Sequence, residues 1–384
     1  MAAASLPLPT SIPGTATPRW CQSVVSGAIA WALSLFMAAP PFSSWSRVNI
    51  DASRAADYLR LCHAPLSRNL VEGMLAYRIA TPTLAWLLHL PDTAALALPY
   101  VFSLAALIVI HRAVRFRSDS LLADAATIGV ACSSTFLYSH YCLGYIDSLT
   151  HLGAAVALIA AAPLSAVAVL IAGLNDERIV LALPFIALWR CPASCLANWK
   201  SPQSWISFGR ATAPLAGGLA GVLFVRHALT AGWLGPGVSM PPLYHQIADT
   251  VRQGRPWLES WSVWFVNWLK GPGWLWLFIA APFLSARWRP ALPPAIVLGF
   301  CFVLACVSTF IVADVARSIG FAFPAALLCI LWVHGLNASA ARKLAVVVAS
   351  LQVVTPAVWI YQGWQWVQFR PLLWEFWLFV HNSR

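Results

Sequence analysis

Long uninterrupted apolar runs constrain this chain more than any other feature of its sequence. Five of them hold at most two charged residues each: 22–42, 92–112, 211–231, 291–312 and 344–362. A helix needs about 20 apolar residues to cross a hydrocarbon core of about 30 Å. Because a backbone in lipid must satisfy its own hydrogen bonds, and because these runs are continuous rather than alternating, they predict membrane-spanning helices rather than a barrel.

Composition supports a lipid environment. Hydrophobic residues make up 60% of the chain and charged residues 10%, whereas soluble domains carry about 25% charged residues. The net charge of +11 does not predict nucleic-acid binding, because the basic residues are scattered among the apolar runs. The positive charge instead helps to predict how the chain is oriented in the membrane, since Lys and Arg are enriched in cytoplasmic loops.

The positions of the basic residues predict a topology. Basic stretches at 111–117, 190–210, 287–289 and 341–343 are expected in the cytoplasm, which places the N-terminus there as well. This topology divides the chain into three regions. They are a disordered cytoplasmic tail at 1–21, a transmembrane helical domain at 22–362 with an outer loop at 43–76, and a Trp-rich interfacial tail at 363–384.

Several segments are too short for a comfortable crossing. The segment 77–90 contains Pro82 and is interpreted as re-entrant or interfacial. The number of crossings between two basic stretches must be even if both stretches are to lie in the cytoplasm. This requires the run 147–174 to break at "AAPLS" into two short helices, so that "NDER" at 175–178 forms an outward-facing turn. The prediction is an all-α polytopic integral membrane protein of about eleven transmembrane helices, several of them short or re-entrant.

Two acidic residues, Asp51 and Asp57, stand in the outer loop of a chain that has only 13 Asp and Glu residues. One interpretation is a solvated loop in which they pair with Arg47, Arg54 and Arg60. The other is a carboxylate that serves as a general base or metal ligand at the membrane surface.

Further polar residues stand at the predicted helix ends. Asp147 begins a short helix, where a carboxylate is also a common N-terminal residue. Asp176 and Glu177 lie in the polar turn between two short apolar helices, and charges near membrane depth are costly and often functional. They are candidate substrate-binding residues, with a capped turn that reaches water as the alternative.

Five candidates remain near the outer ends of other segments. Asp314 and Arg317 are three positions apart, close enough to pair on a helix. Arg226 either extends its charged end to the interface or clamps a phosphate. Tyr77 and Arg78 are two adjacent polar residues at the start of the re-entrant segment.

Motifs of other enzyme classes are absent from the sequence. It contains no G-x-x-x-x-G-K-[ST], G-x-G-x-x-G, H-E-x-x-H or G-x-S-x-G pattern. This argues against an ATPase, a dinucleotide enzyme and a membrane zinc protease. No internal repeat is visible, which disfavours many transporter folds.

The order of these features resembles the GT-C superfamily of polytopic glycosyltransferases. The similar features are a first helix, an outer loop with an acid, a "YR…P" segment, and a polar turn leading into an "LP" helix, "NDERIVLALP". The resemblance implies a lipid-phosphate-linked sugar donor, chemistry on the outer face, and an essential acid in the first outer loop. Asp57 directly precedes Tyr58 and Asp51 lies seven positions before it, so both are candidates for the base.

The sequence thus predicts a glycosyltransferase of the bacterial inner membrane that moves a sugar from a polyprenyl-phosphate-linked donor to an envelope acceptor. Its expected partners are membrane lipid and that donor. The cofactor is unknown, with a divalent metal as an open alternative. Two other functions stay open, and these are a transporter or lipid flippase, and a non-catalytic subunit of an envelope polysaccharide assembly complex.

Overall fold

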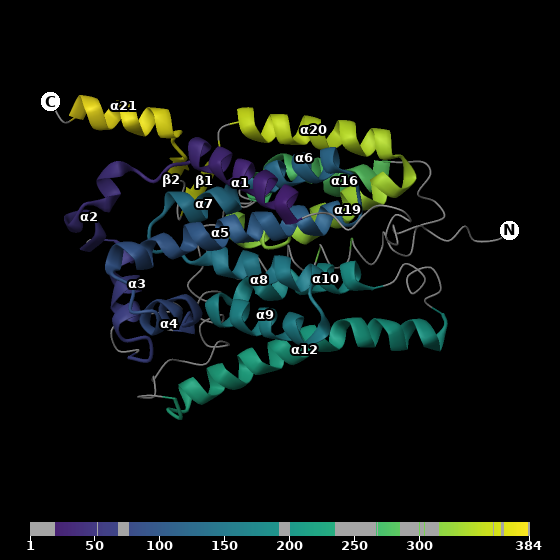
Figure 1. Ribbon diagram of the computed structural model, residues 1–384, viewed down its shortest axis with the longest axis horizontal. Helices are drawn as coiled ribbons and strands as arrows, with labels where there is room; N and C mark the ends of the chain where they lie inside the picture. Colours follow the sequence, from purple (N-terminus) through teal and green to yellow (C-terminus); the bar gives the residue numbers. More distant parts are fainter. Residues whose placement is uncertain are drawn as a thin grey trace.

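The computed structural model describes residues 20–51, 53–67, 77–191, 200–234, 266, 268–284, 299, 303, 315–355, 357–361 and 365–382. The regular structure of these residues is helical apart from one antiparallel hairpin of two strands, with turns and loops between the elements. Figure 1 shows several helices running along the long axis of the molecule, with α2, α3 and α4 gathered at one end.

The helices have the following bounds: α1 Trp20–Met37, α2 Arg47–Asp51, α3 Arg54–His63, α4 Ala80–Leu87, α5 Asp92–Arg115, α6 Ser120–Ala131, α7 Ser134–Tyr141, α8 Asp147–Ile159, α9 Ala162–Asn175, α10 Leu183–Arg190, α12 Pro202–Thr230, α16 Trp276–Leu284, α18 Val315–Gly320, α19 Phe323–Leu336, α20 Ala338–Val354 and α21 Leu372–Asn382. The 3-10 helices are η1 Phe42–Trp45, η4 Glu177–Leu181 and η5 Gly273–Leu275. Strands β1 Val358–Tyr361 and β2 Gln365–Gln368 pair with Val358 opposite Gln368.

Local sequence sets many of these boundaries. Side chains of Ser53, Asp119 and Asn337 accept hydrogen bonds from backbone N–H groups in the first turns of α3, α6 and α20. Proline stands in the first turn of α9, α10, α12 and α19. Proline lacks the N–H that a first turn leaves unpaired, so it starts a helix at little cost.

The number of membrane-crossing helices differs from the prediction. Among the described residues, α1, α5 and α12 are long and apolar enough to cross a membrane, and α6 with α7 makes a fourth if this bent pair counts as one span. The expected count of about eleven is therefore wrong for the described part of the chain. The membrane character itself is supported by these long apolar helices.

Individual segments explain the difference. The apolar stretch of α6 and α7 bends by 56° between the two helices. The run 344–362 is divided between α20, which has 17 residues, and strand β1. The run 291–312 lies outside the described residues apart from Gly299 and Val303, as do residues 1–19 of the predicted tail and 68–76 of the outer loop.

The predicted break within 147–174 is confirmed, and the other short segments have the following structure. The run 147–174 breaks as expected, into α8 and α9. The segment 77–90 contains only the eight-residue helix α4. The Trp-rich tail includes α21, whose Trp374, Trp377 and Phe379 are exposed.

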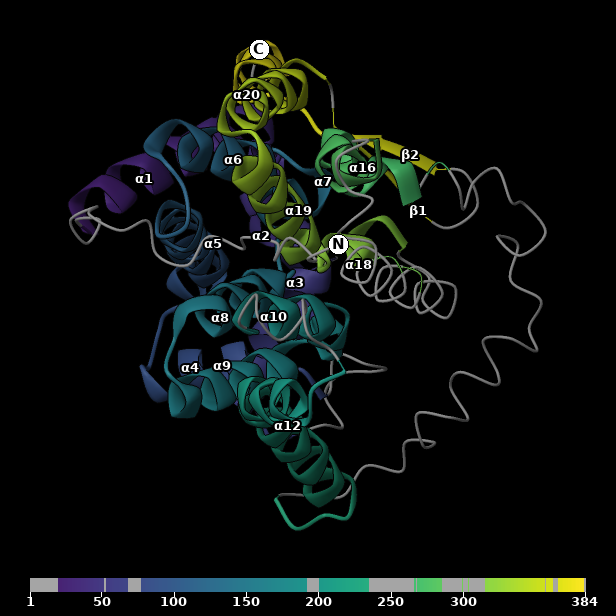
Figure 2. The ribbon, with the colours of Figure 1, turned by 90° about the vertical axis from the view of Figure 1, so that its right-hand side faces the viewer.

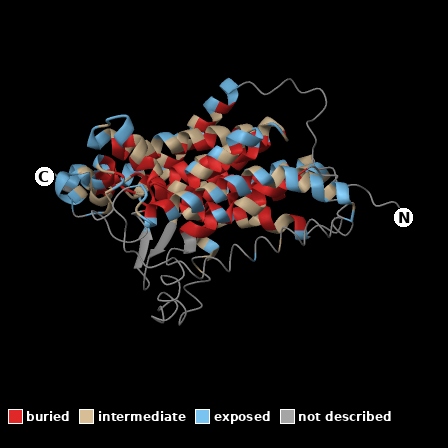
Figure 3. Cartoon of the chain, turned by 90° about the horizontal axis from the view of Figure 1, so that it is seen from below, coloured by how far each residue is buried: buried red, intermediate tan, exposed pale blue. Residues whose placement is uncertain are grey.

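Helices α5, α8, α9 and α12 pack in sequence against one another, and buried residues fill the interior of the body (Figures 2 and 3). Glycines allow close approach where these helices meet. A Cβ at Gly153 would lie 2.6 Å from the Cβ of Ala172, and one at Gly218 would lie 2.5 Å from the carbonyl oxygen of Ala166. Small residues at such interfaces let helices in a membrane come close. This packing brings the start of α8 beside the end of α9.

Candidate functional site

A cluster of ionised side chains lies where α8 begins and α9 ends. Asp147, Asp176 and Arg178 form its centre, and all three are buried. Arg178 Nη2 lies 3.0 Å from Asp147 Oδ1, and Arg178 Nε donates to Asp176 Oδ1 at 2.8 Å. A second bond joins Arg178 Nη2 to Asp176 Oδ2. One guanidinium therefore bridges two buried carboxylates that come from different helices.

The cluster extends from this centre in two directions. On one side, Arg317 Nε of α18 lies 3.0 Å from Asp147 Oδ2. On the other side, Arg78 Nη1 lies 3.1 Å from Asp176 Oδ2, and its Nη2 lies 3.1 Å from Glu177 Oε1. Arg226 Nη2 of α12 then lies 2.9 Å from Glu177 Oε2.

Seven side chains thus form one alternating chain of ion pairs, which we call the ionic chain. In order they are Arg317, Asp147, Arg178, Asp176, Arg78, Glu177 and Arg226. An arginine stands at each end, so cations outnumber acids. The residues come from five separate stretches of sequence, and the fold alone brings them together.

Neutral hydrogen bonds hold the helix ends in this arrangement. Asn175, the last residue of α9, accepts a bond from Thr81 Oγ1 of α4 at 2.6 Å. Its amide nitrogen donates to the carbonyl oxygen of Ile146 at 2.6 Å and to Thr150 Oγ1 of α8 at 3.0 Å. A buried amide with all these bonds made fixes the relative position of three helices. The same bonds position Arg78, which lies just before α4, and Asp176, which directly follows α9.

Aromatic rings cover several of the guanidinium groups. The Arg178 guanidinium lies 4.9 Å from the ring centroid of Phe321. The Arg317 guanidinium lies 5.2 Å from the ring centroid of Tyr138 and 4.9 Å from that of Tyr145. Cation–π contacts of this kind favour a fixed guanidinium plane. The rings cover the faces of these two guanidinium groups, whose nitrogen edges contact the carboxylates.

A fifth arginine, Arg54, adds to the positive charge. It is the first residue of α3, and its guanidinium lies 4.5 Å from the Tyr145 ring centroid, on the ring that Arg317 also contacts. Burial lowers the pKa of Arg54, and the charges of Arg317 and Arg78 lower it further. Five guanidinium groups therefore face three carboxylates, an excess of two positive charges.

The excess charge is accompanied by buried donors that have no acceptor. Among the described residues, no hydrogen-bond partner is present for the Nε atoms of Arg54, Arg78 and Arg226. An unpaired buried donor is costly. An anion with several oxygens would satisfy the donors and neutralise the charge, and arginine is well suited to phosphate.

His151 lies one turn after Asp147 on α8 but takes no part in the ionic chain. Its ring stacks between Phe136, at a centroid distance of 4.3 Å, and Phe321, at 4.7 Å. Neither ring nitrogen has a hydrogen-bond partner among the described residues. No group of three or more His, Cys, Asp and Glu residues in the described part of the chain is arranged to hold a metal ion.

The structure brings together most of the residues predicted from sequence. Arg78, Asp147, Asp176, Glu177, Arg226 and Arg317 all belong to the ionic chain. Tyr77 is buried beside it, and its ring centroid lies 5.8 Å from the Arg226 guanidinium. Asp314 lies outside the described residues. In the described part of the chain, Arg317 contacts Asp147 of α8.

The two predicted first-loop carboxylates do not join the ionic chain. Asp51 is exposed at the end of α2. Asp57 is 42% exposed and pairs with Arg60 at 3.0 Å on the surface of α3. Arg54, three positions before Asp57, is the residue by which this loop contacts the cluster. The role of Asp51 or Asp57 as a base therefore stays a prediction.

Sequence reasoning missed Arg178 and Arg54 as site residues. Arg178 was one of the four polar residues of "NDER" and carried the same signal as its acidic neighbours, namely charge between two apolar helices. Arg54 had no such signal, because a charged residue in an outer loop is ordinarily solvated.

The comparisons with known proteins give no match: no protein-family model, no curated protein and no solved structure matches this chain.

Proposed function

We propose that this protein is a membrane glycosyltransferase that takes a sugar from a polyprenyl-phosphate-linked donor and transfers it to an envelope acceptor. The observation that carries the proposal is the ionic chain, with its excess of buried arginine at one end of the helical body. A phosphate on a lipid is the anion that such a place in a membrane protein would meet. The layout shared with the GT-C superfamily supports the same function.

The arginines would act on the leaving group. In the reaction, the acceptor hydroxyl oxygen bonds to the anomeric carbon while the bond from that carbon to the phosphate oxygen breaks. The phosphate leaves with the electron pair and gains negative charge, which Arg317 and Arg54, whose guanidinium groups both contact the Tyr145 ring, would stabilise. The acidic members hold the guanidinium groups in place before the donor arrives.

The acceptor proton needs a base, and we assign it to Asp51 or Asp57. The carboxylates of Asp147 and Asp176 are buried and each is paired with two arginines, so neither is open to an incoming acceptor. Asp51 and Asp57 lie in the loop that contacts the cluster through Arg54 and are open to an incoming acceptor. A single displacement of this kind inverts the anomeric carbon.

The helix ends support an orientation. Arg115 ends α5, and Arg190 bonds the carbonyl oxygens of Ala157 and Ala160 at the far end of α8. Arg190 thus lies at the end of α8 opposite Asp147, the member of the ionic chain at which this helix begins. Under the positive-inside rule the basic end is cytoplasmic. We therefore propose a cytoplasmic N-terminus and a site on the outer face of the bacterial inner membrane.

The test is transfer from polyprenyl-phosphate-linked sugars by the purified chain in proteoliposomes. Arg317→Gln is expected to lower kcat/KM by at least about 100-fold, because it removes a charge that stabilises the leaving phosphate. Asp51→Asn and Asp57→Asn identify the base, and one of them is expected to lose activity by about 100-fold or more. Arg342→Gln, at the opposite end of the molecule, is the matched control and keeps full activity.

The outcomes separate the alternatives. In one outcome, the wild-type chain transfers no sugar by itself and yet restores transfer when a membrane extract is added. That result would show that the protein is a non-catalytic subunit of an assembly complex. If both Asn variants transfer as well as wild type, the first-loop base is wrong. A transporter or flippase requires polar groups accessible from both membrane faces, whereas the ionic chain lies at one end.

A further inference from the structure

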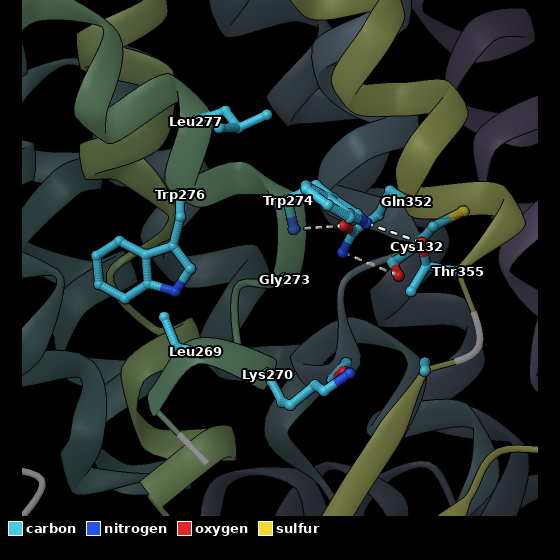
Figure 4. A pocket seen from close by; sticks show the side chains of 11 residues that line it. Cys132, Leu269, Lys270, Gly273, Trp274, Trp276, Leu277, Gln352 and Thr355 are labelled. Atoms are coloured by element: carbon cyan, nitrogen blue, oxygen red, sulfur yellow. Dashed lines mark hydrogen bonds between the residues drawn. The ribbon is translucent and has the colours of Figure 1, made fainter. Parts of the chain in front are cut away.

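A second feature, separate from the ionic chain, is a cavity of about 340 Å³ beside the bend between α6 and α7 (Figure 4). This volume is within the range of small-molecule sites. The described residues that line it come from four elements and the segments beside them: Cys132, Ser134, Leu269, Lys270, Gly273, Trp274, Trp276, Leu277, Gln352, Thr355 and Ala357. The proposed function makes no use of this cavity.

Hydrogen bonds within the wall keep the cavity open. Gln352 of α20 donates to the carbonyl oxygens of Cys132 and Pro272, each at 3.3 Å, and accepts from the backbone N–H of Trp274 at 2.8 Å. Trp274 Nε1 donates to Thr355 Oγ1 at 2.8 Å. The polar atoms of Gln352 and Thr355 are therefore already engaged with the wall.

Gly273 makes this close wall possible. Its φ is +60°, in the left-handed region that favours glycine, and a Cβ there would lie 2.8 Å from the Gln352 amide. Any larger residue would displace the amide that ties three segments together. The cavity is thus a built feature of the fold rather than loose packing.

The remaining lining is apolar with one positive charge. Trp276 donates its indole N–H to the carbonyl oxygen of Trp268 at 3.2 Å, so the rest of its ring is an apolar wall. Leu269 and Leu277 add aliphatic surface. Lys270 is the only charged residue among the described lining, and Figure 4 shows its side chain reaching toward the side on which Thr355 lies.

No ion pair joins Lys270 to another residue in the described part of the chain. An ammonium beside apolar walls gains from an anion that it can bond. We propose that the cavity binds one anionic amphiphile, with its anionic group at Lys270 and its hydrocarbon chain against Trp276 and Leu277. The shared chemistry, one anionic group on an alkyl chain, is available both as a free fatty acid and as a phospholipid.

The experiment uses three photoactivatable alkyl probes with the full chain in nanodiscs: a fatty acid, a phosphatidylglycerol and a neutral fatty alcohol. Labelled positions are mapped by mass spectrometry. One or both anionic probes are expected to label 268–277 or 352–357 at least about fivefold more strongly than the alcohol. Labelling by the acid alone identifies a free carboxylate, and labelling by the phospholipid identifies a membrane lipid.

Variants then test the assigned roles. Lys270→Gln is expected to lower anionic labelling about fivefold, while Lys270→Arg retains it. Leu277→Trp fills the cavity and lowers labelling by all three probes, and its melting temperature in detergent shows that it is folded. Lys343→Gln, an exposed lysine outside the cavity, is the matched control. Labelling that is spread along the chain, or equal for acid and alcohol, would overturn the proposal.

Because the cavity is independent of the ionic chain, its test does not depend on sugar transfer. Lys270→Gln is expected to lose lipid labelling and to keep sugar transfer. Arg317→Gln is expected to keep lipid labelling and to lose sugar transfer. The two proposals therefore fail separately.

Discussion

Arg317 and Arg226 stand at opposite ends of one alternating chain of ion pairs, although they lie on different helices, α18 and α12. Between them, each carboxylate is contacted by two arginines. Charge in this chain is therefore shared, and the loss of an inner member exposes two partners at once. Four predictions follow from this arrangement and from the packing that supports it.

Arg178→Met is expected to destabilise the protein by about 3–5 kcal/mol, because it leaves Asp147 and Asp176 buried with one arginine each. Arg342→Met removes an arginine that is 44% exposed and pairs with Asp119, and it should cost less than about 1 kcal/mol. The free energy of unfolding in detergent, measured with denaturant, compares the two. Equal effects would show that the ionic chain contributes no more than a surface pair.

Stability is expected to fall in acid. Burial acts to raise the pKa of Asp176, but the charges of Arg178 and Arg78 outweigh it and hold that pKa well below its usual value. A lowered native pKa gives stability that is complete above the unfolded pKa of about 4 and is lost as the pH falls through the native pKa. The melting temperature should therefore be flat from pH 7 to about pH 4 and drop below it.

Asp176→Asn should remove part of this acid-dependent loss, because the variant has no carboxyl to protonate there. Asp57→Asn is the matched control, since Asp57 pairs on the surface, and it should keep the wild-type pH profile. A profile that is unchanged by Asp176→Asn would assign the acid dependence to other groups.

Two adjacent glycines of α12 should respond in opposite ways. Gly218→Ala places a Cβ 2.5 Å from the carbonyl oxygen of Ala166 and is expected to cost about 1–3 kcal/mol by forcing α12 away from α9. Gly217→Ala meets nothing within 4 Å and should gain up to about 1 kcal/mol from helix propensity. Thermal unfolding of both variants in one detergent provides the measurement. Similar shifts for both would contradict the observed packing of α12.

Asp57→Asn is expected to leave stability within about 0.5 kcal/mol of wild type, because the pair with Arg60 is solvent-exposed. If Asp57 is the base, the same variant loses sugar transfer by about 100-fold or more. Folding and activity are thus separated in one protein. The matching variant Arg60→Gln breaks the same pair without removing the carboxylate and should retain transfer.

The sequence carried enough information to predict the break between α8 and α9 and the polar turn after it. Pro163 marks the start of α9, and "NDER" interrupts two apolar runs. The bend between α6 and α7 could not be predicted in this way, because Cys132 and Ser133 stand at the break without proline or glycine. Gln352, distant in sequence, donates to the carbonyl oxygen of Cys132 at that break.

The members of the site were easier to predict than their partners. Charged residues between apolar helices identified most of the ionic chain, whereas the expected pairing of Arg317 with Asp314 rests on a local rule and falls outside the described residues. In the fold, Arg317 reaches Asp147 on another helix, which only tertiary packing decides. Asp51 and Asp57 lie outside the ionic chain, since a rare charge in sequence does not determine which way a helix face turns.

The contact between Gly153 and Ala172 has a consequence for the evolution of this chain. It locks the register of α8 against α9, and the ends of these two helices hold Asp147 and Asp176. A single inserted residue in either helix would rotate its terminal carboxylate by about 100° around the helix axis. Length changes should therefore be tolerated in the loops that carry no member of the ionic chain and eliminated from this helix pair.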